Sequence, residues 1–207
     1  MIDKLKNFKN LSPAAKASIA LLFANLVLKG LSMISGPIFT RLMTTSQYGV
    51  VSTFMSWQSM LMTIVTLNLG AGVFNNGMLE YKDDRDCFQF SLTVVSTITA
   101  LIFLAIYLIF PNILTNFFEM PAIMIYILVI YYIFVPVYGY WSGRQRYEFK
   151  YKALTCITIA MAVVSLMIGL IVVLIVPEED KALARIISSV LPNIVVGIFF
   201  FFYIAIK

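Results

Sequence analysis

Six long apolar runs divide this 207-residue sequence, and they constrain its fold more than any other feature. A helix rises about 1.5 Å per residue, so about 20 apolar residues cross a hydrocarbon core about 30 Å thick. Each of the six runs is long enough to do so. The predicted membrane spans lie at about 17–39, 50–69, 88–110, 122–141, 153–176 and 183–206.

The composition agrees with an all-α, multi-pass membrane protein. Hydrophobic residues make up 61% of the sequence and charged residues 12%, whereas a soluble domain is nearer half apolar and a quarter charged. We expect residues 17–207 to form one six-helix transmembrane bundle, preceded by a basic cytoplasmic segment at residues 1–16. No basic stripe with interleaved aromatic residues is present, so nucleic acid is not an expected partner.

Several classes of chemistry are excluded by residue content. The sequence has no histidine, which removes Ser-His-Asp catalysis and His-ligated metals or haem. Its two cysteines, Cys87 and Cys156, are too few for a Cys-based metal site. No metal-ligand spacing appears among the acidic residues. We therefore expect no cofactor, no metal and no enzymatic activity.

The positions of Lys and Arg predict the orientation in the membrane. Eleven of the 15 basic residues fall on one side of the predicted spans and three on the other, while Lys29 lies within a span. Basic residues concentrate on the cytoplasmic side of membrane proteins, so both termini are expected in the cytoplasm. The three residues assigned to the outer side are Arg41, Lys181 and Arg185.

Glycine and proline are expected to mark the boundaries between spans. Gly36 and Pro37 close the first span, and Pro177 ends the fifth. The connecting segments 70–87 and 111–121 are expected to be loops.

Lys29, near the middle of the first span, is the most informative polar residue. A lysine at a helix centre costs about 2.5–3.5 kcal/mol on membrane insertion, whereas an apolar residue returns only about 0.3–0.6 kcal/mol. The cheapest arrangement turns Lys29 toward the protein interior or a wet cavity. At about 100° per residue, Asn25 and Ser32 share its face. We interpret Lys29 as functional, the alternative being a structural lysine that bonds backbone carbonyls or snorkels.

Two further stripes of small and hydroxyl residues follow helical spacing. In the second span, Ser56, Ser59 and Thr63 are candidate cavity residues. A weaker stripe in the fifth span includes Thr158, Ser165 and similar small residues. Because such residues are typical of close helix contacts in membranes, packing is the favoured interpretation for both stripes.

Basic residues also cluster just before the fifth span. Arg144 and Arg146 are candidates for contact with a headgroup at the cytoplasmic rim. The favoured alternative is a topology signal attracted to anionic lipid.

Several short motifs occur in an ordered series along the chain. They are Pro37-Ile38, Thr40-Arg41-Leu42, Gln47-Tyr48-Gly49, Leu67-Asn68-Leu69-Gly70 and Gly143-Arg144-Gln145-Arg146-Tyr147. With the polar first helix, this series resembles the N-terminal region of bacterial polysaccharide-biosynthesis transporters. These are the O-antigen-type flippases of the multidrug/oligosaccharidyl-lipid/polysaccharide exporter superfamily.

The resemblance implies two six-helix bundles around a central cavity and alternating access. It implies a substrate, an oligosaccharide on a polyprenyl-pyrophosphate carrier, and a place in the bacterial cytoplasmic membrane. Lys29 in the cavity wall and Arg41 at the outer rim would supply charge for the phosphates. Membrane lipids are the other expected partners.

The resemblance covers only the first half of such a flippase. We therefore expect a truncated or half-length flippase that pairs with a second six-helix half or with its own copy. A non-transporting membrane partner or fragment is the main alternative. A cation-coupled drug exporter is less favoured, because it needs an intramembrane carboxylate. A membrane glycan enzyme is also less favoured, because only Asp83, Asp84 and Asp86 offer clustered carboxylates.

Overall fold

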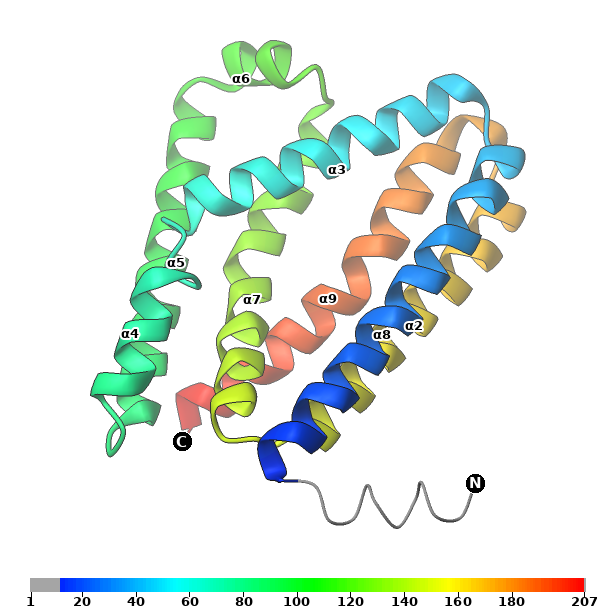
Figure 1. Ribbon diagram of the computed structural model, residues 1–207. Coiled ribbons are helices and arrows are strands. Elements are labelled where there is room, and N and C mark those ends of the chain that lie inside the picture. The colour runs from blue at the N-terminus through cyan, green and yellow to red at the C-terminus, as the bar shows by residue number, and fades with distance from the viewer. Residues whose placement is uncertain (1–11, 207) are drawn as a thin grey trace, which may run out of the picture.

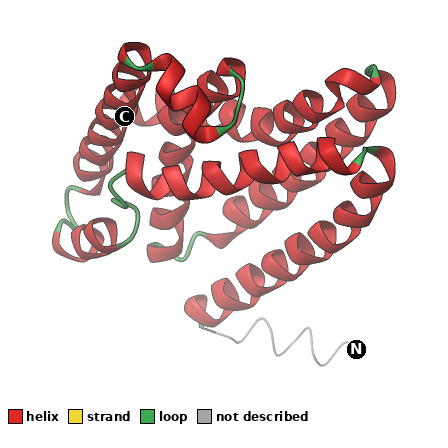
Figure 2. Cartoon of the chain, turned by 90° about the horizontal axis from the view of Figure 1, so that it is seen from above, coloured by secondary structure: helices red, strands yellow, loops and turns green. Residues whose placement is uncertain are grey.

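The computed structural model describes residues 12–206, which form helices joined by short loops, with no strand among them (Figure 2). The longer elements are α2 (Pro13–Leu42), α3 (Thr45–Val65), α5 (Arg85–Ile109), α7 (Ala122–Tyr147), α8 (Tyr151–Ile175) and α9 (Lys181–Ile206). The shorter elements are α4 (Gly72–Glu80), α6 (Pro111–Phe118) and the 3-10 helix η1 (Glu178–Asp180). Both segments that we expected to be loops, 70–87 and 111–121, thus contain a short helix.

Within residues 12–206, five helices are long and apolar enough to cross a membrane, namely α2, α5, α7, α8 and α9 with its preceding 3-10 turn. This result confirms an all-α, multi-pass membrane protein. Helix α3 has 21 residues and carries no charge, but it does not meet the same criteria. Its Ser, Thr and Gln residues lower its hydropathy.

The second predicted span, 50–69, is displaced toward the N-terminus in the structure. Thr44 and Gln47 form a reciprocal capping box that starts α3 at Thr45. Leu67 and Asn68 both adopt left-handed backbone angles, which follow the end of α3 at Val65. The predicted boundaries were therefore wrong at both ends, because hydropathy alone does not reveal caps.

The first helix is longer than predicted. Its N-terminus begins at Pro13, where the Ser12 hydroxyl accepts a hydrogen bond from the Ala15 N–H. At the other end, Gly36 and Pro37 do not close the helix, which continues to Leu42. The Thr40 hydroxyl donates to the Pro37 carbonyl at 3.0 Å. Because proline has no N–H, the Met33 carbonyl one turn earlier lacks its helical donor, and membrane helices tolerate such an interior proline.

The helices pack in a continuous chain of contacts (Figure 1). Helix α2 lies along α8, α8 contacts α9, α9 contacts α7, and α7 contacts α5. Helix α3 crosses this arrangement obliquely, and α4 lies beside α5, so together they bring the chain from the upper end of Figure 1 back to the lower end. The first and last described residues both lie at that lower end.

The main hydrophobic core lies where α3, α5, α7 and α9 meet. Phe54 of α3, Leu128 and Tyr132 of α7, and Ile186 of α9 are completely buried. The Tyr132 hydroxyl also donates to the Gln58 carbonyl at 3.1 Å. Helix α3 is therefore anchored to the bundle through one side.

Helices α7 and α9 approach each other closely at Gly197. A Cβ atom added at Gly197 would lie 2.5 Å from the backbone oxygen of Phe134, well inside van der Waals contact. Small residues allow membrane helices to pack at such short range. Gly197 is therefore a position where no larger residue fits without movement of the backbone.

Candidate functional site

The polar face predicted on the first helix is exposed in the structure. Asn25, Lys29 and Ser32 are all exposed residues of α2, while Ala24 and Phe39 are buried in the bundle. Within residues 12–206, Lys29 forms no hydrogen bond or ion pair. Lys29 therefore does not point into the interior of this bundle, and its role as a cavity residue stays a prediction beside the structural alternative.

The hydroxyl stripe of α3 is exposed as well. Ser56, Ser59 and Thr63 lie on the side of the helix opposite the buried Phe54 and Leu61. The Ser56 and Ser59 hydroxyls donate to carbonyls of their own helix, at 2.8 Å and 3.0 Å. Because these side chains are exposed in the described part of the chain, they do not form a buried packing contact within this bundle, and cavity lining stays a prediction.

The stripe of small and hydroxyl residues on α8 is partly packed against other helices and partly lines a cavity. Gly169 is buried against α2 and α9, as packing predicts. Thr158 and Ser165 line a cavity of about 390 Å³ between α2, α7, α8 and α9. Ser32 lines the same cavity from α2, so the cavity adjoins the polar face that carries Lys29.

Arg185 of α9 lies in this cavity, and our sequence reasoning missed it. Its Cζ atom sits 3.8 Å from the centroid of the Phe39 ring, in a cation–π contact. Its Nη1 atom is buried and has no hydrogen-bond partner within residues 12–206. We had assigned Arg185 to the outer side, although it falls inside the predicted span 183–206. That position inside an apolar run was the signal that could have identified it.

Arg41, the predicted outer-rim residue, is exposed in the last turn of α2. The end of this helix is held by Lys181, whose Nζ donates to the Leu42 carbonyl at 3.2 Å. A cation near the C-terminus of a helix interacts favourably with the helix dipole, and Arg41 occupies such a position.

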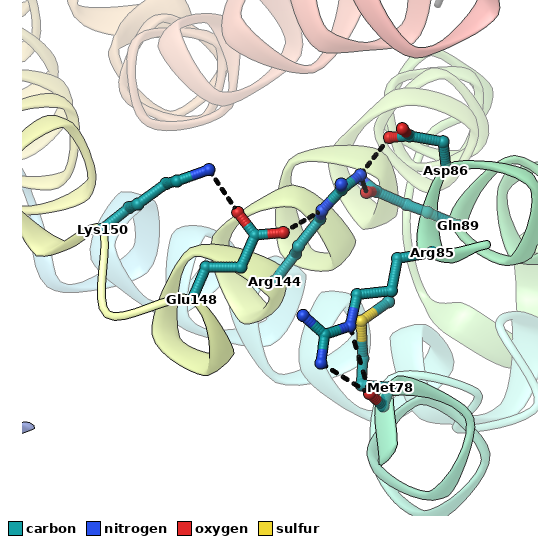
Figure 3. A network of polar contacts seen from close by, with 7 residues as sticks. All are labelled: Met78, Arg85, Asp86, Gln89, Arg144, Glu148 and Lys150. Carbon is teal, nitrogen blue, oxygen red and sulfur yellow. Dashed lines mark hydrogen bonds and ion pairs between the residues drawn. The ribbon is translucent and has the colours of Figure 1, made fainter. Parts of the chain in front are cut away.

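A network of ion pairs joins α5 and α7 at the end of the bundle where both described chain ends lie (Figure 3). The Arg144 guanidinium pairs with Asp86 of α5, and its Nε donates to Glu148 at 2.7 Å. Lys150 donates to the other Glu148 oxygen at 2.6 Å. Of the two predicted rim residues, Arg144 is thus engaged by carboxylates, whereas Arg146 is exposed.

The charges around Glu148 stabilise its ionised form. Partial burial on its own raises the pKa of this carboxyl group, but hydrogen bonds from Lys150 and Arg144 outweigh that effect and lower the pKa below its ordinary value. Only about 15% of the Glu148 side chain and 16% of the Arg144 side chain are exposed, so solvent screens this pair weakly. These ion pairs therefore link the start of α5 to the connection between α7 and α8.

No three His, Cys, Asp or Glu side chains of residues 12–206 gather in a group that could hold a metal ion. The chemistry that the exposed face and the cavity offer is therefore that of cations and hydroxyl groups. Such groups suit the binding of an anionic, hydroxyl-rich ligand.

Comparison with known proteins places the chain in a family. The family model described as polysaccharide biosynthesis protein matches residues 14–207. No curated protein and no solved structure gives a significant match. The chain belongs to this polysaccharide biosynthesis family, whose members are mostly transporters and flippases. The suspected resemblance to flippases of polysaccharide biosynthesis is confirmed at the level of the family.

Proposed function

We propose that this chain forms one side of a pathway that carries an oligosaccharide on a polyprenyl-pyrophosphate lipid across the bacterial cytoplasmic membrane. The family match supports a role in polysaccharide synthesis or export. The membrane-length helices supply the hydrophobic body that such a pathway needs. Sugar and phosphate groups need polar surroundings in the bilayer, while the lipid tail remains in hydrocarbon.

The observation that carries the proposal is the exposed polar face of α2. Lys29 lies 16 residues into a 30-residue membrane helix and has no partner in the described chain. An uncompensated lysine at the bilayer centre costs about 2.5–3.5 kcal/mol, so this face meets water or another polar surface and not lipid tails. The exposed hydroxyl groups of α3 extend the polar surface on a second helix.

A complete pathway needs a second wall. We propose that α3 acts as a sixth crossing of the membrane and that a second six-helix bundle, or a second copy of the chain, faces the polar sides of α2 and α3. Both described chain ends lie at one end of the bundle. This arrangement allows two bundles to stand side by side in the same orientation, with both ends in the cytoplasm.

Thiol labelling tests whether the Lys29 face is wet. Cys87 and Cys156 are exposed free cysteines, so both are first replaced by serine. We expect Lys29→Cys to react with a membrane-impermeant charged thiol reagent at least about tenfold faster than Ile34→Cys, because thiolates form poorly in hydrocarbon. Ile34 is a suitable control, since it is 58% exposed on the same helix but points about 140° away. Equally slow labelling at both positions would refute a wet face at Lys29.

A further inference from the structure

We propose that α6 is an interfacial helix, which lies flat at the membrane surface and immerses Ile113 and Phe117 in lipid. The partner of this surface is the phospholipid leaflet at the end of the bundle opposite both described chain ends. The orientation predicted from Lys and Arg makes this the outer leaflet. Because α6 lies on a different part of the molecule from the polar faces of α2 and α3, the inference goes beyond the proposed transport function.

The connections of α6 place it at a membrane surface. Only Phe110 separates it from the end of α5, and residues 119–121 lead from it to α7. Figure 1 shows α6 lying across the neighbouring ends of α5 and α7. Both of these helices are long and apolar enough to cross the membrane, so the point where they are joined lies at the level where the hydrocarbon core ends.

The surface of α6 is divided into three faces. Successive residues of a helix turn by about 100°, so two residues four apart share a face. The helix has a polar pair, an apolar pair and a packed pair, which are Asn112 with Asn116, Ile113 with Phe117, and Leu114 with Phe118. The polar and apolar pairs are exposed, whereas the packed pair belongs to the main hydrophobic core or lies against it. The exposed apolar face thus lies between the polar face and the packed face.

This order of faces matches the three surroundings of a helix at the edge of a membrane surface, which are protein, lipid and water. Ile113 and Phe117 are each 65% exposed, and residues 110–118 include no charged side chain. No charge therefore keeps the apolar face out of hydrocarbon. Interfacial helices bury such a face about 5–10 Å into the boundary between headgroups and acyl chains.

The exposed apolar face also continues the lipid-facing surface of α5. Ile106 and Ile109, in the last turn of α5, are exposed apolar residues of a membrane-length helix. Ile113 follows Ile109 by only four residues, so the apolar surface of α5 continues along the chain into α6. A protein partner suits this face less well, because two side chains expose far less than the roughly 800 Å² per partner that a stable interface buries.

Contacts with two other helices hold α6 in this position. The Trp57 ring of α3 lies 4.8 Å from the Phe118 ring and 5.6 Å from the Phe117 ring, between centroids. The Thr115 hydroxyl lies within hydrogen-bond distance of the Tyr107 hydroxyl of α5, at 3.3 Å. Trp and Tyr are enriched at the boundary between membrane and water. These contacts therefore join α3 and α5 to α6 at the level of the membrane surface.

Spin labels at four positions of α6 test the proposal. Both native cysteines are first replaced by serine, and the purified full-length chain is reconstituted into vesicles of phosphatidylethanolamine and phosphatidylglycerol. Nitroxide collisions are measured with oxygen, which concentrates in hydrocarbon, and with a neutral nickel chelate, which remains in water. We expect the oxygen-to-nickel collision ratio to be at least about threefold higher for labelled Ile113→Cys and Phe117→Cys than for labelled Asn112→Cys and Asn116→Cys, because the two faces differ in depth.

Two results would overturn the proposal. Equal ratios at all four positions would show that α6 does not lie at the lipid boundary. Protection of the labels at 113 and 117 from both reagents would show that a protein surface covers this face instead. If Phe117→Cys disturbs the contact with Trp57 and does not fold, the ratio of Ile113→Cys to Asn112→Cys decides alone. Each of these results is independent of thiol labelling at Lys29, so the failure of one proposal leaves the other standing.

Discussion

Lys29→Ala is expected to lower the export of lipid-linked glycan repeat units about 10- to 100-fold, the range for loss of one charge-assisted contact to a phosphate. Lys29→Arg keeps the charge and should retain most of the export. The measurement is the ratio of exported to cytoplasmic repeat units in cells that carry each variant.

The stability of the same variant distinguishes this role from a structural one. Removing a lysine from a helix centre relieves an insertion cost of about 2.5–3.5 kcal/mol, so Lys29→Ala should insert at least as well as the wild type. If Lys29 is functional, Lys29→Ala should therefore lower export without lowering membrane insertion. Ile34→Ala, on another face of the same helix, is the matched control. Undiminished export by Lys29→Ala would assign Lys29 to snorkelling or backbone contacts.

Gly197→Ala is expected to lower the free energy of unfolding by about 1–3 kcal/mol, the usual cost of overpacking a close contact. The new methyl group would meet the Phe134 carbonyl oxygen at 2.5 Å. Because that obstacle is backbone, α7 and α9 have to move apart. Equilibrium unfolding in mixed micelles reports the loss.

Gly139→Ala separates the steric effect from helix propensity. Gly139 lies on α7, and a Cβ added there meets nothing within 4 Å. Alanine is favoured over glycine in a helix by about 0.5–1 kcal/mol, so this variant should be as stable as the wild type or more stable. If both substitutions had the same effect, the α7–α9 contact would not depend on Gly197.

Helix number and length were largely readable from the sequence, because crossing a bilayer imposes a minimum apolar length. Five of the six predicted spans correspond to helices that meet that requirement in the described part of the chain, and Pro136 and Pro192 lie inside α7 and α9. The second span was the exception. Its hydroxyl residues lower its hydropathy, so its boundaries are harder to predict from an apolar run. The start of α3 is set by a capping box, which depends on two short-range hydrogen bonds.

The candidate site was predictable in its residues but not in its geometry. Lys29 could be identified because the free-energy cost of inserting a lysine into the membrane depends on the residue type and its depth, and not on the fold. Whether Ser56 and Ser59 pack or face a cavity depends on which side of α3 meets α7 and α9, and only the fold decides that. Arg185 illustrates the same limit, because its guanidinium packs against Phe39 and Gly169, which lie far from it in the sequence.

The export of lipid-linked repeat units after deletion of the gene is the most direct measurement of the proposed function. We expect repeat units to accumulate on the cytoplasmic face of the membrane and surface polysaccharide to disappear, with both effects reversed when the gene is returned. Continued export at the wild-type rate in the deletion strain would contradict a role in translocation. It would favour instead a membrane partner that does not transport.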